Sequence, residues 1–403
     1  MKLEKEISEE IHAFASKKWK ISLFGSDNSD TAIISHYLRN NDPALRNEAI
    51  EIGSSYLEKE YEAEVPPILA EHALQYLIEF KENIPFPKPE NPTFTFIDLF
   101  AGIGGFRLAL QNLGGECVYS SEWDKSAQKT YYTNFGEIPF GDITKDENKK
   151  WIPKKFDILC GGFPCQPFSR AGVSARNFLG QAHGFEDEKQ GNLFFEIVEI
   201  IKNHRPKAVF LENVKNLRSH DRGNTIKVIE EQLRELGYSF DSKVVNAQTE
   251  VPQRRERTFI ICFRDKNQKF NFPEFKGEKK ILRSILEENV PDEFTISDNL
   301  WIGHQNRSIR NKNRGTGFTV SLANLDKPSN TIVARYFKDG KECLIPQDGK
   351  NPRMLTPREC ARLQGFPDTF VCYPTKTSAY KQFGNSVAVP VIQRIGNEII
   401  KLI

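Results

Sequence analysis

Between residues 94 and 263, short apolar runs alternate with amphipathic stretches that carry apolar residues at helical spacing. Each apolar run has the length of a buried strand and is followed by turn residues. The predicted strands are residues 95–100, 116–121, 156–160, 206–211 and 258–263. Strands that alternate with helices in this way predict an α/β fold, in which a largely parallel sheet carries helices on both faces.

Residues 1–83 show a different pattern, which is helical. Apolar residues within 68–80 recur at the spacing of one helix face, and Asp42-Pro43 marks the expected start of another helix. Four prolines follow within residues 84–92, a composition typical of a semi-rigid linker. We therefore predict a helical N-terminal extension, which packs on the body or on a partner, and a linker over 84–93.

After residue 263 the alternation stops, and proline, asparagine, lysine and arginine cluster. Residues 331–337 have the pattern of a strand, and residues 338–341 have that of a hairpin turn. We therefore predict a small irregular β-rich domain over 264–353. Helical patterns return over 354–403, so this last segment is expected to complete the α/β domain of residues 94–263.

A glycine turn follows the first predicted strand and precedes a helix. Gly102 and Gly104 let the backbone approach a nucleotide-like ligand at the start of that helix. The spacing is G-x-G-G rather than the G-x-G-x-x-G of dinucleotide sites, which favours a cofactor without a pyrophosphate. An acid follows each of the next two predicted strands. Glu122, beside Trp123, follows strand 116–121, and Asp142 follows a third, short strand. Each acid alone is typical of a turn or cap, but the ordered set indicates an adenosine pocket.

Residues 161–169, Gly-Gly-Phe-Pro-Cys-Gln-Pro-Phe-Ser, predict a rigid loop at a strand end. Ligands bind at the carboxyl ends of strands in open α/β sheets, so the Cys165 thiol is a candidate nucleophile. Cys160, by contrast, has the setting of a buried structural cysteine. Residues 169–191 lack periodicity and are expected to form a mobile lid. Glu212, at the end of another strand, is a candidate proton donor or a capping acid.

Two groups of basic residues are candidates for binding an anion, a carbonyl or DNA. The arginines of Gln253–Arg257 precede a strand and form either a solvated basic edge or a guanidinium that holds an anion or a carbonyl. Arg307, Arg310 and Arg314 alternate with asparagines, a composition suited to reading base edges in DNA. The same stretch would equally suit a loop-rich insertion without a ligand.

The net charge is only +2, but it is distributed unevenly. Residues 1–83 hold 9 Lys+Arg against 16 Asp+Glu, so the remaining residues carry a net +9 and are the expected polyanion-binding part. The seven cysteines include no C-x-x-C pair, and no apolar run approaches the ~18 residues of a membrane span. We therefore expect a cytoplasmic protein without disulfides, a metal site or membrane contact.

Several motifs occur together in the order typical of one enzyme family. They are Phe100–Gly105, Glu122-Trp123, Gly141–Ile143, Gly162–Gln166, Glu212–Val214, Gln253–Arg257 and Gly384–Val387. With these motifs, residues 94–400 resemble a bacterial DNA (cytosine-5)-methyltransferase. The resemblance implies a Rossmann-like, S-adenosylmethionine-dependent catalytic domain and a small target-recognition domain, with DNA in the cleft between them. Residues 171–186 and 334–340 are similar to segments of enzymes that methylate CCWGG-type sites.

The resemblance also implies roles for individual residues. Cys165 would attack C6 of the cytosine, and Glu212 would supply a proton at N3. Asn213 would orient that site, Arg255 would hold the base's O2, and Arg257 belongs to the same motif. The implied cofactor-binding residues are Phe100, Gly102, Gly104, Glu122, Trp123, Asp142, Ile143, Pro164, Leu193 and Asn385. The candidate DNA contacts are Ser169, Arg307, Arg310, Arg314, Arg335 and Tyr336.

The implied partner is double-stranded DNA, bound in the nucleoid by a monomer, with a restriction endonuclease encoded alongside. A transfer RNA cytosine-5 methyltransferase shares these motifs and is one alternative. A catalytically inactive DNA-binding homologue is another, although the intact set of Cys165, Glu212 and Arg255 speaks against it. A nicotinamide oxidoreductase fits less well, because the glycine turn lacks the pyrophosphate-binding pattern.

Overall fold

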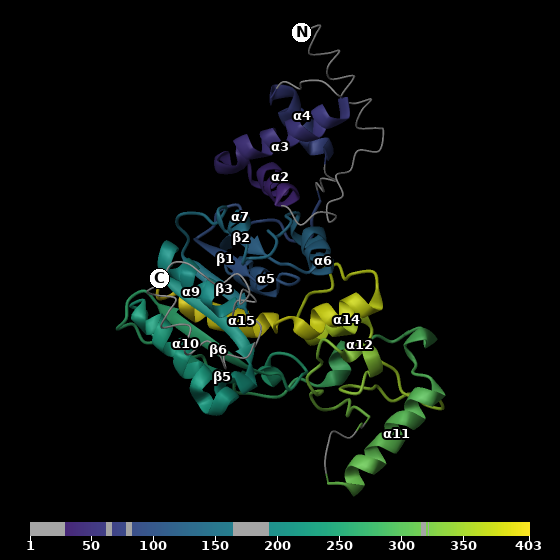
Figure 1. Ribbon diagram of the computed structural model, residues 1–403. Helices are drawn as coiled ribbons and strands as arrows, with labels where there is room; N and C mark the ends of the chain where they lie inside the picture. Colours follow the sequence, from purple (N-terminus) through teal and green to yellow (C-terminus); the bar gives the residue numbers. More distant parts are fainter. Residues whose placement is uncertain (1–28, 62–66, 78–82, 164–192, 316–319, 321) are drawn as a thin grey trace. The chain divides into compact units, whose positions relative to one another are not determined.

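The structure is a computed structural model that describes residues 29–61, 67–77, 83–163, 193–315, 320 and 322–403. Its contacts divide the chain, which Figure 1 colours along the sequence, into two compact units. The first unit combines Met1–Lys88 with Tyr119–Ile152, and the second combines Pro89–Val118 with Pro153–Ile403. The N-terminal helices therefore share a unit with a segment from the predicted α/β domain, and each unit is described by itself below.

A six-stranded sheet forms the centre of the fold, with strand order β2-β1-β3-β4-β6-β5. The strands are β1 (Phe94–Leu99), β2 (Gly115–Ser121), β3 (Ile158–Gly162), β4 (Ala208–Val214), β5 (Asp241–Asn246) and β6 (Glu256–Phe263). Strands β1, β3 and β4 pair in parallel, whereas β6 is antiparallel to both β4 and β5. The predicted α/β class is confirmed. Strand β4 runs further than predicted, so Glu212 and Asn213 lie inside it.

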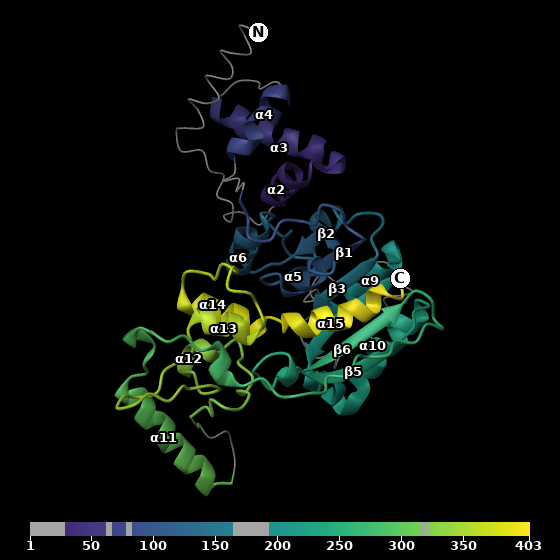
Figure 2. The same cartoon turned by 180° about the vertical axis from the view of Figure 1, so that it is seen from behind.

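Helices cover both faces of the sheet in the second unit. They include α5 (Gly105–Gln111), α9 (Leu193–His204), α10 (Asn224–Glu235) and α15 (Val389–Ile400). Figures 1 and 2 show α10 on one face of the sheet and α15 on the other. Helix α10 buries Thr225, Ile229 and Leu233, which are four residues apart and therefore lie on one side of the helix. The ring of Phe106 in α5 packs edge-on against Phe210 of β4, with centroids 5.1 Å apart.

The region 264–353 contains less β structure than its sequence predicts. Its longest regular element is α11 (Asp298–Asn313), and its described β contacts are isolated bridges. The predicted strand at 331–337 is wrong, because the short helix α12 (Tyr336–Asp339) begins within it. Tertiary contacts override the local β propensity: the amide of Ile332 donates to Oε1 of Gln253 at 3.0 Å instead of to a neighbouring strand.

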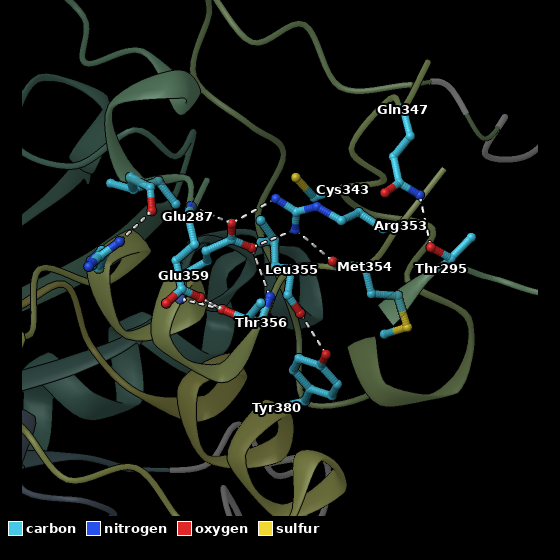
Figure 3. A network of polar contacts seen from close by, with 12 residues as sticks. Glu287, Thr295, Cys343, Gln347, Arg353, Met354, Leu355, Thr356, Glu359 and Tyr380 are labelled. Carbon is cyan, nitrogen blue, oxygen red and sulfur yellow. Dashed lines mark hydrogen bonds and ion pairs between the residues drawn. The ribbon is translucent and has the colours of Figure 1, made fainter. Parts of the chain in front are cut away.

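A buried polar network joins the end of this region to the C-terminal helices α13 (Pro357–Leu363) and α14 (Lys376–Asn385) (Figure 3). Arg353 donates two hydrogen bonds to Glu359, at 2.7 and 2.8 Å, and both side chains are almost fully buried. The same carboxylate accepts from the amides of Glu287 and Thr356. Thr356 and Glu359 form a capping box at the start of α13, where the sequence predicts a helix.

The first unit contains the N-terminal helices α2 (Asp30–Asn40), α3 (Pro43–Tyr61) and α4 (Pro67–Leu77). It also contains α6 (Lys125–Phe135) and the single turn α7 (Asp146–Lys149). The helical character predicted for the N-terminal region is confirmed for its described residues, and α3 begins at the predicted proline. Among the described residues, none of the helices combines the length and apolar character needed to cross a bilayer.

Candidate active site

The entry to the cysteine loop lies beside Glu212 in the second unit. Strands β3 and β4 pair in register, with Gly162 opposite Glu212. A Cβ atom added to Gly162 would lie 3.2 Å from Oε2 of Glu212, so only glycine leaves this carboxylate its full space. The side-chain amide of Asn213 donates to the carbonyl of Phe163 at 2.9 Å. The chain therefore enters the loop held by two β4 residues, whereas Pro164, Cys165, Ser169 and the predicted lid lie outside the described residues.

Glu212 forms a buried ion pair with Arg257. Nε of Arg257 lies 2.9 Å from Oε1 of Glu212, and the two side chains are 16% and 10% exposed. The antiparallel register places Val214 opposite Arg257, so Glu212 is two residues away on the same face of the sheet. Burial raises the pKa of Glu212, although the charges of Arg257 and Arg255 act in the opposite direction. This carboxyl therefore holds a proton more readily than an exposed glutamate does.

Arg255 is engaged with the main chain. Its guanidinium is 2% exposed and donates to the carbonyls of Ile332, at 3.3 Å, and Gly384, at 3.2 Å. It also donates to the carbonyl of Ser386. Of the two candidate catalytic arginines in the motif, the structure therefore brings Arg257 to Glu212 and uses Arg255 to hold the end of α14 and the segment around residue 332.

The glycine turn and Asn385 lie close together in the second unit. Gly102 and Gly104 have positive φ angles, of 56° and 85°, which strongly favour glycine. A Cβ atom added to Gly102 would meet nothing within 4 Å, so the turn borders open space. A Cβ atom added to Gly105 would lie 2.7 Å from Val387, two residues after Asn385. The C-terminal segment thus returns to the glycine turn. Phe100, which directly follows β1 and precedes the turn, also has a positive φ angle.

The acids predicted for the adenosine pocket lie together in the first unit. Oε1 of Glu122 accepts the amide of Asp124 at 2.7 Å, and Glu122 is 8% exposed. Asp142 accepts the amide of Thr144 at 3.0 Å, which closes a turn. The third strand predicted before Asp142 is an isolated bridge between Ser121 and Phe140. Beside these acids, the indole of Trp123 is 76% exposed, while Ile143 is buried. In the second unit, Leu193 is the half-buried first residue of α9.

The predicted DNA contacts divide into exposed and buried residues. Arg307 and Arg310 lie on α11 and Arg314 caps it, so this stretch is a helix within the region predicted to be irregular and β-rich. Arg307 is 3.4 Å from Asp339, and Arg335 is exposed just before α12. Tyr336 is fully buried, and its hydroxyl donates to the carbonyl of Cys343 at 2.6 Å. The Tyr336 side chain is therefore not available to DNA in this structure.

Solved structures of other proteins share this fold. The S. pombe Dnmt2 methyltransferase aligns with a TM-score of 0.59 at 18% identity, covering 77% of this chain and 99% of that one. A Spodoptera frugiperda DNMT2 variant aligns with a TM-score of 0.58 at 20% identity, with the same coverage. At such low identity these matches concern the fold alone, which this chain shares with the two structures named methyltransferases or DNMT2.

The sequence comparisons then specify the family. The model of the C-5 cytosine-specific DNA methylase family matches residues 94–401, so the chain belongs to this family and is a DNA cytosine-5 methyltransferase. It is 48% identical to the Type II methyltransferase M.DsaV of Dactylococcopsis salina, covering 78% of this chain and 88% of the relative. It is also 48% identical to M.SsoII of Shigella sonnei, with coverages of 81% and 85%. The family match begins where the predicted linker ends, so the N-terminal helices lie outside it.

Proposed function

We propose that this enzyme methylates C5 of a flipped-out cytosine at a specific site in double-stranded DNA, through a covalent bond between Cys165 and C6. The observation that carries the proposal is the buried Glu212, which is paired with Arg257 and lies beside the entry to the Cys165 loop. Cytosine C5 is a poor nucleophile until a thiolate adds at C6 and breaks the aromaticity of the ring. In this proposal, Glu212 and Arg257 are the described groups that assist such an addition.

Each described residue has a distinct task in this proposal. Glu212, whose pKa is raised by burial, holds a proton that it donates at N3 as charge develops on the ring. Arg257 orients that carboxyl and takes the O2-binding role, because Arg255 is engaged with three carbonyls. Asn213 holds the carbonyl of Phe163 and so fixes the entry to the cysteine loop.

Cys165 acts as the nucleophile in this scheme and is released at the end. A free thiol with a pKa of ~8.5 is mostly protonated at neutral pH, so a cation at the same sheet edge favours the reactive thiolate. Loss of the C5 proton and cleavage of the sulfur–carbon bond then restore the aromatic ring. The target base is inaccessible inside a duplex, and flipping it out costs a few kcal/mol.

The methyl donor used by this class of enzyme is S-adenosylmethionine, which supplies an electrophilic methyl group when bound. The open space at Gly102 fits a ligand that approaches the glycine turn. In the second unit, Phe100, Leu193 and Asn385 would contribute to holding it, together with Pro164. In the first unit, Trp123 would stack on the adenine, which its exposed indole permits. The carboxylates of Glu122 and Asp142 would take the ribose hydroxyls and the adenine amine.

The names of the relatives support a proposal for the biological role of the enzyme. M.HpaII of Haemophilus parainfluenzae, 45% identical over 83% of this chain, is also named a Type II methyltransferase. We infer that the present enzyme protects DNA from a cognate restriction endonuclease and acts as a monomer. The exposed Arg310, Arg314 and Arg335 are the proposed DNA contacts on the described surface, and Ser169 is a further one.

Covalent trapping tests the proposal directly. A duplex with 5-fluorocytosine at the target position should trap the wild-type protein in the presence of S-adenosylmethionine, because fluorine replaces the proton whose loss releases the thiol. Cys165→Ser should not be trapped, yet should still bind the cofactor. Bisulfite mapping of methylated plasmid gives the target site, and transfer RNA offered as the acceptor tests the alternative substrate. Efficient methylation of transfer RNA with none of duplex DNA would overturn the proposed substrate.

A further inference from the structure

We propose that the N-terminal helix α2 positions the segment Glu137–Asp142, and that Ser35 and His36 are positioning residues for methyl transfer. The inference rests on the proposed function, because it concerns the two acids, Glu122 and Asp142, that are proposed to hold S-adenosylmethionine. Helix α2 lies outside the matched family region, whereas the segment it contacts lies inside it. Both belong to the first compact unit.

Ser35 makes a buried hydrogen bond to the start of this segment. Its hydroxyl accepts the amide of Ile138 at 2.9 Å and donates to the carbonyl of Ala32 at 2.9 Å. Ser35 is fully buried, and Ile138 is 2% exposed. A buried amide without an acceptor is costly, so this bond specifies where the chain leaves α6 and turns toward Asp142.

His36 contacts the residue that links the two acids. Its ring lies 5.1 Å from the ring of Phe140, which is stacked on Tyr119 at 4.9 Å. The carbonyl of Phe140 accepts the amide of Glu122 at 2.8 Å, and Asp142 follows two residues later. A displacement of Phe140 therefore moves the backbone of both acids, and α2 limits that displacement.

Three further contacts join the N-terminal helices to this segment or to residues near it. The side-chain amide of Asn40 donates to Glu137 at 3.1 Å. A Cβ atom added to Gly136 would lie 2.4 Å from the guanidinium of Arg39, so the arginine closes over the glycine that ends α6. From α3, Glu48 lies 3.4 Å from Lys150. Two of these contacts lie at or directly before the start of the acid-bearing segment, and the third lies at Lys150, beyond its end.

The contacts within the helical bundle provide a matched control. Glu71 of α4 accepts from the hydroxyl of Tyr37 at 2.6 Å and from Arg46, which joins the N-terminal helices to one another. Arg46→Ala weakens the bundle without touching residues 119–152. Glu51→Ala, on the exposed surface of α3, is a second control, which measures the effect of replacing an exposed residue of the same helices by alanine.

The test measures cofactor binding, kinetics and local exchange on the full chain. Ser35→Ala and His36→Ala should each raise the dissociation constant for S-adenosylmethionine about tenfold, which corresponds to ~1.4 kcal/mol. The KM for S-adenosylmethionine should rise in parallel, while the KM for DNA stays within about twofold of wild type. Hydrogen exchange without ligand should accelerate at residues 137–142 and remain unchanged in β3 and β4. His36→Phe, which keeps the ring, should restore binding.

The outcomes separate this inference from the proposed function. If wild type and Glu122→Gln bind S-adenosylmethionine equally, the proposed cofactor role of Glu122 fails. If Glu122→Gln weakens binding while Ser35→Ala and His36→Ala match wild type in binding and exchange, the positioning role alone is overturned. The positioning role is also overturned if Arg46→Ala has the same effect as the two α2 substitutions. The same holds if the KM values for S-adenosylmethionine and for DNA rise together, because general destabilisation then explains the result.

Discussion

Replacing Arg257 by alanine removes the ion-pair partner of the buried Glu212 carboxylate. The two side chains are 2.9 Å apart and only 16% and 10% exposed, so water substitutes poorly for the lost guanidinium. Removing one member of such a pair costs about 3–5 kcal/mol when the remaining group stays charged. Protonation of Glu212 limits this loss, which makes the cost dependent on pH.

The direction of the pH dependence follows from the raised pKa. Burial already raises the pKa of Glu212, and Arg257 is the first of the two charges that oppose this shift. Without Arg257 the pKa rises further, so the native protein keeps a proton that the unfolded chain releases above about pH 4.5. The free energy of unfolding of Arg257→Ala therefore decreases as the pH rises from about 4.5 to the pKa of Glu212 in the folded protein. We expect Arg257→Ala to lose about 1–2 kcal/mol at pH 5 and about 3–4 kcal/mol at pH 8.

Urea unfolding at pH 5, 6.5 and 8, followed by tryptophan fluorescence, measures this difference. Arg254→Ala is the matched control, because Arg254 lies in the same motif but is exposed, and it should change stability by less than about 0.5 kcal/mol. Single-turnover methylation by Arg257→Ala should fall by about 10²–10⁴-fold if the pair serves proton donation. Equal stability of Arg257→Ala and Arg254→Ala at pH 8, or a larger loss at pH 5 than at pH 8, would refute the reasoning.

Three further predictions concern other parts of the chain. Glu359→Gln leaves the buried Arg353 without its counter-charge and should cost about 3–5 kcal/mol in urea unfolding, whereas Asp368→Asn, in an exposed pair, should cost under about 1 kcal/mol. Asn213→Ala frees the carbonyl at the entry to the cysteine loop and should lower the single-turnover rate about tenfold with cofactor affinity unchanged; an unchanged rate contradicts the anchoring role. Arg310→Ala should reduce the salt dependence of DNA binding by a slope of about 0.9, and an unaltered slope in titrations excludes a phosphate contact.

The parts of the fold that depend on short-range patterns could be predicted from the sequence. The apolar residues at helical spacing between the predicted strands indicated amphipathic helices, and α10 is one of these, with Thr225, Ile229 and Leu233 buried on one face. Thr356-Pro357 predicts a helix start, and α13 begins there with a capping box. The ordered motifs likewise predicted the family that the comparisons confirm. Such signals lie within a few residues of one another, so they are present before the chain folds.

Contacts between distant residues were decided only by the tertiary structure. The motif Gln253–Arg257 contains three arginines, and the sequence does not rank the two candidate catalytic ones. The pairing of β4 with β6 places Arg257 beside Glu212, whereas Arg255 donates to carbonyls more than 70 residues away. The apolar run at 331–337 resembled a strand, yet long-range hydrogen bonds turn it into a loop and a helix. The docking of α2 on residues 136–140 had no local signal. Strand register and burial bring together side chains that are far apart along the chain, and a local pattern contains no record of that proximity.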